Sequence, residues 1–518
     1  MRFHFRRLIC LCVTLLICMS FSLPAHAGGE TLTIMVYDRG NMNAAYGTPT
    51  HNAWTAYIQH TVEKELNIQV EFVSVSRSND VSQLSIMMAN KTAPDIVFTY
   101  DQTMWLQMCE TGLATDLTEL LPTSGKNILQ HLETVLPYGQ YNGRQMGLCN
   151  LRAVTDASCS FIRKDWLDQL GIVLKKNEDG IHTVTPEELH AILLRFQQEN
   201  LGGQGTTAPA FYSFGTTYWP VLRLLEPFYQ QDQLTEEDLF ALPFFLYPGA
   251  KEGYRYLNRL YNDGLLNSDF AFIGDYDKND YNQAISTGRI GFWVNDPWYG
   301  MGNDSLLTTM CMNDPKAEVV AVDILTPEGQ DAYKYEYNDV GLYVFVPSFS
   351  QKAEAAVRYL NLWADPDYDF VLRFGFENEH YAMIDGLPTV IDEDYNSQTR
   401  ISVADLALMY NGCAYMDKNL DARLGVQMYS TSQQELRRQA YYVGTRNGFQ
   451  VPLISHYIPE AIAHAETLEH LERELRISCI MCSAESFDQV WEKQVSNYLN
   501  AGGQLVIDAK REAYRINR

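Results

Sequence analysis

The hydrophobic pattern after an apolar leader alternates between the spacing of strands and the spacing of helices. Three short runs rich in β-branched and aromatic side chains predict strands, at residues 31–38, 68–75 and 93–100. Three stretches with apolar positions at helical spacing lie between and after them, at residues 52–66, 80–92 and 101–112. Strands that alternate with helices in this way predict a parallel α/β sheet.

A second α/β unit is predicted to begin near Cys159, where residues 159–171 have the pattern of a strand that turns into a helix. The same criteria predict further helices and strands, at residues 186–199, 252–266, 280–294 (a helix and then a strand), 317–325, 340–347 and 351–366. From about Ser455 the pattern is almost entirely helical, and Gly502 with Gly503 predicts a helix stop. The chain of 518 residues is long enough for two or three domains.

Residues 1–27 have the pattern of a secretory signal peptide. Arg2, Arg6 and Arg7 precede an apolar run at residues 8–21, and Ala25-His26-Ala27 supplies small residues at a cleavage site. The residues before Cys18 fit a lipoprotein signal poorly. We therefore expect secretion across the cytoplasmic membrane, to a periplasmic or an extracellular location, without direct membrane insertion.

Charge excludes some partners. The formal net charge is −25, and removal of the three leader arginines leaves 36 basic against 64 acidic residues, a net charge of −28. Such acidity repels nucleic acid and anionic lipid, so neither is an expected partner. It favours a neutral or cationic ligand. The alternative is that the acidic surface only keeps the protein soluble.

The cysteines predict no disulfide framework and no metal site. Seven remain after the leader, an odd number spread over a long chain. Cys479 and Cys482 form a C-x-x-C within a helical pattern, where a local disulfide or two free thiols is expected. Asp275, Asp277 and Asn279 have the spacing of the start of a calcium loop, but the later positions lack the glycine and glutamate of such loops, which favours a solvated turn.

Motifs of common enzymes are absent from the sequence. It has no G-x-S-x-G, no H-E-x-x-H and no G-x-x-x-x-G-K-[ST]. We therefore expect no catalytic residues and no cofactor. A pair of carboxylates for glycoside cleavage stays open, because a sequence does not give the distance between two acids.

Aromatic and polar side chains gather at the predicted ends of strands. Residues 288–300 (GRIGFWVNDPWYG) combine a strand with a loop that contains Asp296, Trp298 and Tyr299. In open α/β sheets, ligands bind beyond the carboxyl ends of the strands, where Tyr100 and Asp38 also fall. An aromatic ring can stack on the C–H face of a sugar while nearby polar groups bond its hydroxyls. This favours a ring-stacking pocket; the alternative is that these rings are core and loop anchors.

Several longer segments resemble one family. They are APDIVFTY followed by GLATDLTELL, SFIRKDWLDQLGI, LYNDGLLNSDFAF followed by AISTGRIGFWV, FGFENEHYAMIDGLP, and the terminal SFDQVWEKQVSNYLNAGGQLVIDAKREAY. In this order the chain resembles the extracellular solute-binding proteins of ABC importers, in the maltose/oligosaccharide-type family and its LipO-like branch. Arg289 stands where that branch usually has Lys, and Asn378 where it has Gly.

The resemblance implies a two-lobed periplasmic-binding-protein fold of type II. Each lobe would be an α/β unit with a mixed, mostly parallel sheet flanked by helices, and crossing strands would form the hinge. The first lobe would comprise residues 31–152 and 340–390, and the second residues 158–335 and 392–518. The crossings would fall near residues 152–157 and 335–340.

The resemblance also implies a ligand between the lobes. The expected ligand-binding residues are Asp38, Arg39, Tyr100, Asp101 and Trp105 from the first lobe, with Arg163, Tyr212, Trp219, Asn295, Asp296, Trp298 and Tyr299 from the second. Arg163 could instead pair with a carboxylate of its own lobe. The expected function is to bind a carbohydrate, an oligosaccharide above all, as a monomer and to deliver it to ABC permease subunits by hinge closure. A secreted carbohydrate-active enzyme and a ligand-sensing receptor are the alternatives.

Overall fold

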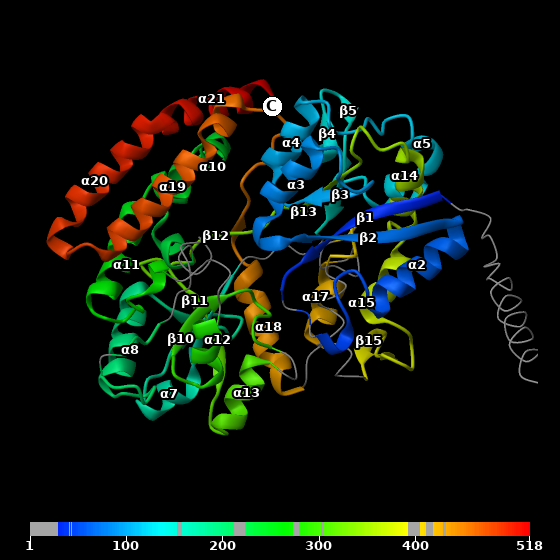
Figure 1. The fold of residues 1–518 in the computed structure, drawn as a ribbon. Coiled ribbons are helices and arrows are strands. Elements are labelled where there is room, and N and C mark those ends of the chain that lie inside the picture. Colours follow the sequence, from blue (N-terminus) through cyan, green and yellow to red (C-terminus); the bar gives the residue numbers. More distant parts are fainter. Residues whose placement is uncertain are drawn as a thin grey trace, which may run out of the picture.

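The computed structural model describes residues 30–517, except residues 41, 43, 153–157, 207, 212–222, 273–278, 302–304, 392–404, 411–417 and 428–430. The predicted signal peptide therefore lies outside the described residues. Figure 1 shows two lobes side by side, each with its own strands and helices. Two large clusters of buried apolar side chains form their cores, one in each lobe. Within the described part of the chain, no helix combines the length and the apolar character needed to cross a membrane.

The sheet of the first lobe is built from five strands. They are β1 (Glu30–Asp38), β2 (Ile68–Ser76), β3 (Val97–Thr99), β6 (Leu148–Leu151) and β13 (Val340–Phe345). β1 pairs with β2 in parallel. The backbone N–H of Met35 donates to the carbonyl of Ile96, and that of Ile96 donates to the carbonyl of Thr33, which joins β1 to the segment that leads into β3. β13 lies between β3 and β6 and is antiparallel to both. The order is therefore β2-β1-β3-β13-β6, and the predicted β-α-β-α-β start is confirmed.

Helices cover this sheet. They are α2 (Ala53–Leu66), α3 (Asp80–Ala89), α4 (Gln102–Glu110), α5 (Leu121–Ser124), α6 (Lys126–His131), α14 (Ala353–Trp363) and α15 (Pro366–Phe374). The start of α2 follows from its cap: Asn52 Oδ1 accepts the backbone N–H groups of Trp54 and Thr55 at 2.9 and 3.0 Å, and Thr55 Oγ1 accepts that of Asn52 at 2.8 Å. Each bond satisfies a donor that a helix terminus leaves free.

A hairpin explains one departure from the family pattern. β14 (Tyr381–Ile384) and β15 (Leu387–Val390) pair antiparallel, and Asn378 in the turn before them has a φ of +64°. Only glycine adopts this left-handed conformation freely, and asparagine is one of the few other residues that tolerates it. Asn378 is thus compatible with the backbone that a glycine would have there.

The second lobe contains a sheet with the order β10-β7-β11-β9-β8. Its strands are β7 (Cys159–Arg163), β8 (Lys175–Lys176), β9 (His182–Val184), β10 (Phe292–Asn295) and β11 (Val319–Ile324). Of these four strand pairings, only that of β11 with β9 is parallel. The predicted mostly parallel sheet is therefore wrong for this lobe. β7, like β13, directly follows a crossing, and each of the two runs antiparallel to both of its neighbours.

Helices surround the second sheet. They are α7 (Lys164–Gln169), α8 (Pro186–Gln198), α10 (Glu236–Ala241), α11 (Ala250–Asn262), α12 (Asn279–Ser286), α13 (Leu306–Asn313) and α18 (Thr431–Thr445). The predicted helical C-terminal stretch is confirmed as α19 (Pro459–Met481), α20 (Phe487–Tyr498), the π-helical turn η9 (Leu499–Gly503) and α21 (Gln504–Ile516). These helices form the outer side of the lobe (Figure 1). Gly502 has a φ of +114° and breaks the helix as predicted, although a further helix follows at once.

The chain passes between the lobes more often than predicted. Residues 406–410, which the sequence analysis assigns to the second lobe, pack in the first core, and Tyr410 pairs with Leu151 at the end of β6. α17 (Lys418–Gln427) packs on β15, whereas α18 packs on β7 and β11. The strand β16 (Gly448–Phe449) then pairs with β12 (Lys334–Tyr335) beside the other crossing.

Two buried ion pairs hold the chain where β12 leaves the second lobe. Lys334 Nζ lies 2.6 Å from Asp323 Oδ1, and Arg223 Nη1 lies 2.9 Å from Glu226 Oε2. Glu226 Oε1 also accepts the backbone N–H of Tyr335 at 2.8 Å. All four charged side chains are at most 2% exposed. A buried charge is costly unless it is paired and hydrogen-bonded, so these contacts fix the start of the crossing.

Replacement of Glu226 by Gln is expected to change how stability depends on pH. Burial raises the pKa of Glu226 to about 7 from an ordinary value of 4.5, so the folded protein keeps a proton that the unfolded chain releases. The resulting stabilisation is present below the unfolded pKa and is lost as pH rises through the folded pKa. We expect the melting temperature of Glu226→Gln, relative to wild type, to be higher at about pH 8 than at about pH 5.

The control is Glu199→Gln, which removes an exposed carboxylate 3.9 Å from Arg195. Its melting temperature relative to wild type should be nearly the same at both pH values. A difference between Glu226→Gln and wild type that does not change with pH would contradict the prediction.

Candidate ligand-binding site

The carboxyl end of β1 carries a stack of rings and guanidinium groups. The rings of Tyr37 and Tyr100 are parallel within 11°, with centroids 6.1 Å apart. The guanidinium of Arg77 lies 5.1 Å from the centre of the Tyr37 ring and 5.0 Å from that of Tyr100. Asp80 accepts hydrogen bonds from Tyr37 Oη at 2.6 Å and from Arg77 at 3.0 Å. These contacts hold the half-buried Tyr100 in one orientation.

Arg39 lies beside this stack and is fixed by a bidentate pair. Its Nε and Nη2 donate to the two carboxylate oxygens of Asp405 at 2.7 and 2.8 Å. Although burial opposes it, this carboxylate raises the pKa of Arg39. Burial and the negative charge of Asp405 raise the pKa of Tyr100, against the nearby charges of Arg39, Arg152 and Arg77, so its phenol remains a neutral hydrogen-bonding group.

Asp38 and Asp101 have local roles in the free protein. Asp38 Oδ1 accepts the backbone N–H of Gly40 at 2.8 Å. Asp101 Oδ1 accepts that of Met104 at 2.9 Å and so caps α4. Trp105 on the same helix is fully buried, and its ring stacks on that of Tyr343 at 4.8 Å. Of these predicted residues, Trp105 belongs to the core of the first lobe.

In the second lobe, the loop after β10 presents one exposed ring. Trp298 is 41% exposed, and the guanidinium of Arg437 lies 5.7 Å from the centre of its ring. Asn295 is buried, and its Nδ2 donates to the hydroxyl of Tyr281 at 3.1 Å. The half-buried Tyr299 donates its hydroxyl hydrogen to Asn282. Asn295 and Tyr299 thus support the loop, and Trp298 is the ring that a ligand could reach.

Arg163 pairs with carboxylates of its own lobe, which is the alternative role that the sequence left open. Its side chain is 1% exposed, and Nη2 lies 2.6 Å from Asp165 and 3.1 Å from Asp314. Its guanidinium also lies over the ring of Trp166, and Nη1 donates to the carbonyl of Gly288 at 3.2 Å. These partners all belong to the second lobe. Tyr212 and Trp219 lie outside the described residues.

Sequence reasoning missed the contribution of α18. Gln433, Arg437 and Tyr441 follow one another at intervals of four residues, so they share one face of that helix. Arg437 lies between the rings of Trp298 and Tyr441, at 5.7 and 5.5 Å from their centres. The spacing was visible in the sequence, but no motif drew attention to this helix.

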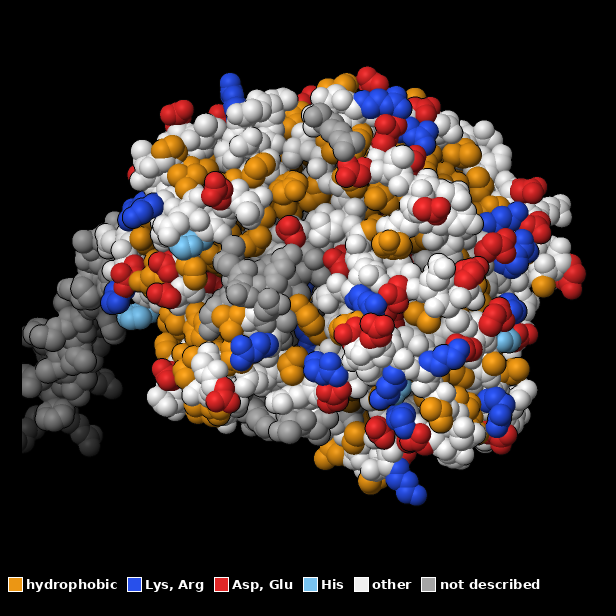
Figure 2. All heavy atoms as spheres, turned by 180° about the vertical axis from the view of Figure 1, so that it is seen from behind, with side chains coloured by type: hydrophobic (Ala, Val, Ile, Leu, Met, Phe, Trp, Pro, Cys, Tyr) orange, Lys and Arg blue, Asp and Glu red, His pale blue; other side chains and the backbone are white. Residues whose placement is uncertain are grey.

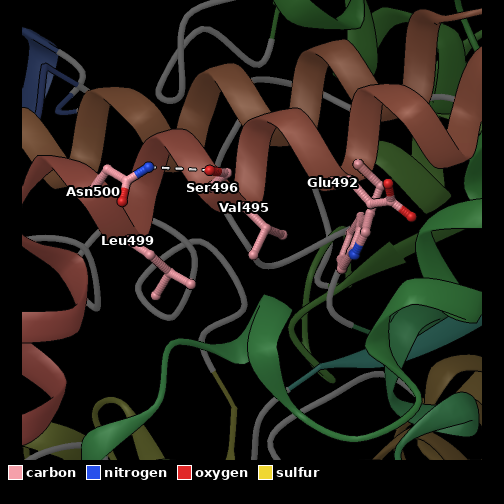
Figure 3. Close-up of a pocket in the computed structure, with 6 residues that line it drawn as sticks. Glu492, Val495, Ser496, Leu499 and Asn500 are labelled. Atoms are coloured by element: carbon pink, nitrogen blue, oxygen red, sulfur yellow. Dashed lines mark hydrogen bonds between the residues drawn. The ribbon is translucent and has the colours of Figure 1, made fainter.

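A pocket on the outer helices of the second lobe lies apart from the predicted ligand residues. This pocket of about 310 Å³ lies on α20, lined by Trp491, Glu492, Val495, Ser496, Leu499 and Asn500 (Figure 3). None of the predicted ligand residues lines it. On the face drawn in Figure 2, acidic and basic side chains are interspersed and form no single basic patch.

The cysteines of the described residues are free thiols, and these residues contain no cluster of metal ligands. In the described ranges, no three or more His, Cys, Asp or Glu side chains are grouped to hold a metal ion. The possible calcium loop at residues 275–279 lies largely outside those ranges. Cys479 and Cys482 are free thiols, as are Cys109, Cys149, Cys159 and Cys311, while Cys413 is not described.

Two α/β lobes joined by crossing segments, with polar and aromatic side chains at the ends of their strands, define a two-lobed binding protein. The chain belongs to the bacterial extracellular solute-binding protein family, whose model matches residues 57–369. It is 22% identical over 343 residues to lipoprotein LipO of Bacillus subtilis (strain 168), a match that covers 64% of each chain. The chain thus spans somewhat less than two thirds of the length of that relative.

Solved structures share the fold over almost the whole chain. Alginate-binding protein AlgQ2, solved without calcium ion, has a TM-score of 0.68 at 14% identity and covers 94% of this chain and 98% of its own. The substrate-binding protein FusA of S. pneumoniae, solved in complex with kestose, has a TM-score of 0.67 at 14% identity and covers 94% of this chain and all of its own. The predicted two-lobed fold class is therefore confirmed.

Replacement of Arg163 by Met is expected to lower the stability of the protein by about 3 kcal/mol, because it leaves partly buried carboxylates without their cation. The affinity of the folded protein for its ligand should stay the same. Thermal melting and calorimetric titration check the two parts. The control is Arg195→Met on the exposed face of α8, and an unchanged melting temperature with lost binding would show that Arg163 contacts the ligand.

Proposed function

We propose that the protein is an extracytoplasmic receptor that binds a carbohydrate, an oligosaccharide above all, and delivers it unaltered to an ABC import permease. The family to which the chain belongs consists of solute-binding proteins. Relatives of the same fold are described as binding alginate, kestose and N-glycans. The observation that supports this proposal most directly is the placement of an exposed indole and a half-buried phenol at strand ends of two different lobes.

The proposed mechanism uses these two rings as parts of one site. A sugar ring stacks on Trp298 from the second lobe and on Tyr100 from the first, while Arg39, Asp38 and Asp296 bond its hydroxyl groups. A ligand that touches both lobes makes contacts in the closed form that the open form cannot make. It therefore shifts the population toward the closed form. The closed, loaded protein is then the form that docks on the permease.

The proposal also covers the cellular compartment and the oligomeric state of the protein. Residues 1–27 direct it across the cytoplasmic membrane, to a periplasmic or an extracellular location. It acts as a monomer, and nucleic acid is not a partner. It performs no chemistry on its ligand, because the receptor must release the sugar intact to the permease.

A glycan panel tests the proposal. We expect at least one oligosaccharide to raise the melting temperature of the purified protein and to lower its radius of gyration in small-angle scattering. Trp298→Ala and Tyr100→Ala should each weaken that binding about 10-fold or more, since burial of one aromatic side chain contributes about 1.5–3 kcal/mol.

The matched control is Tyr141→Ala. Tyr141 is half-buried like Tyr100, but it lies in the hairpin of β4 (Gln140–Tyr141) and β5 (Arg144–Gln145) of the first lobe. Its replacement should leave the affinity unchanged. If no glycan of the panel alters the melting temperature, the receptor is not one for carbohydrates; release of shorter products from a bound glycan would replace the proposal by an enzyme.

A further inference from the structure

Arg437 on α18 is a buried cation with no carboxylate at ion-pair distance among the described residues. It is 7% exposed, and its Nε and Nη1 are enclosed without a hydrogen-bond partner in that part of the chain. The other arginines of the described chain that are buried to this degree each have a carboxylate at ion-pair distance: Arg163 with Asp165, Arg223 with Glu226, and Arg476 with Glu472. Arg437 is the exception among them.

This arrangement costs free energy in the unliganded protein. A guanidinium carries five N–H donors in a planar fork, and burial of unmatched donors forfeits their bonds to water. The rings of Trp298 and Tyr441 offset part of the cost through cation–π contacts. They leave Nε–H and Nη1–H without an acceptor among the described residues. These two groups lie on different edges of the guanidinium, and each edge, completed by Nη2, can bind a carboxylate with two parallel hydrogen bonds.

The helix that carries Arg437 lies on the side of the second lobe that faces the first lobe. α18 packs on β7 and β11 and contacts α17 of the first lobe, and Figure 1 shows it on the side of its lobe that faces the other lobe. Burial raises the pKa of the Cys159 thiol, and the charge of Arg437 is near enough to oppose that rise. Cys159 opens β7, so Arg437 lies near the start of that strand.

The neighbours of Arg437 suit a sugar. Trp298 offers an exposed ring, Tyr441 a phenol, and Gln433, whose Nε2 donates to Thr308 Oγ1 at 3.1 Å, an amide one turn earlier on the same helix face. We propose that these four side chains form a subsite for a sugar residue that carries a negative charge, with the anionic group on Arg437 and the sugar ring on Trp298. This inference rests on the proposed carbohydrate-binding function and specifies its substrate class: acidic oligosaccharides, with ring carboxylates as the expected source of the charge.

The acidity of the whole chain does not decide the charge of this ligand. The formal net charge of −25 acts through solvent and is screened within roughly 10 Å at moderate salt. A charge-assisted pair between buried groups is screened much less. The expectation of a neutral or cationic ligand, drawn from net charge, is therefore replaced for this subsite by the local presence of an unmatched cation.

The test compares each acidic sugar with its uncharged ester. Oligomers of galacturonate, mannuronate and glucuronate are titrated by calorimetry beside their methyl esters, which keep the rings and lose the charge. The panel also includes neutral fructo- and malto-oligosaccharides and sulfated oligosaccharides. We expect at least one acid to bind about 10-fold or more tightly than its ester, because the ester cannot accept a charge-assisted hydrogen bond from Arg437 as a carboxylate does. Tighter binding of a sulfated sugar than of its desulfated form would support the anionic subsite and assign the charge to sulfate.

Arg437→Gln is expected to abolish the preference for acid over ester. Because this variant removes an unmatched buried charge, its ligand-free melting temperature should equal or exceed that of wild type. The matched control is Arg438→Gln, which removes the same charge from the next residue, an exposed one bound to Glu435. It should keep the preference.

The other possible outcomes distinguish failure of the acidic subsite from failure of the proposed carbohydrate receptor. Neutral sugars that bind while acids bind no better than their esters would overturn the acidic subsite and leave the carbohydrate receptor standing. A panel without any binder would overturn both. If Arg437→Gln lowers the melting temperature and weakens acid and ester equally, Arg437 is a structural anchor for Trp298 and the inference is wrong.

Discussion

The chain passes between the lobes at several places, and these crossings limit how the two lobes can move relative to each other. At one of them, a carboxylate of the second lobe accepts the backbone N–H of Tyr335 in the interior, and buried cations balance its charge. The lobes therefore cannot drift apart, because several segments tie them together. They keep separate cores, so rotation about the connecting segments disturbs little packing. This arrangement suits the hinge closure that we propose.

Much of the fold could be predicted because each lobe repeats simple patterns. The first strand and helix begin within a residue of their predicted positions, since Asn52 supplies an unmistakable cap and the strand is bounded by polar residues. Strand direction in the second sheet could not be predicted, because β7 arrives from the other lobe and no local periodicity encodes the direction of its approach. Residues 406–410 were misassigned for the same reason: an apolar run does not indicate which of two cores will bury it.

The candidate site was partly visible in the sequence and partly hidden. Tyr100 and Trp298, the two rings of the proposed site, could be named from the sequence, since loops at strand ends combine aromatic and polar residues. Trp105 shares that composition, yet it is buried against Tyr343, and only the three-dimensional packing separates the two cases. Arg437 was missed because its distinguishing property is the absence of an acceptor around a buried guanidinium, which no sequence pattern expresses.

The position of β13 in the first sheet has a consequence for biogenesis. This strand lies between β3 and β6, but it follows β6 in the chain only after most of the second lobe has intervened. A ribosome must therefore finish more than half of the polypeptide before the middle of the first sheet exists. Non-local pairing of this kind slows folding. A chain that folds late stays unfolded for longer, which suits the proposed export across the cytoplasmic membrane.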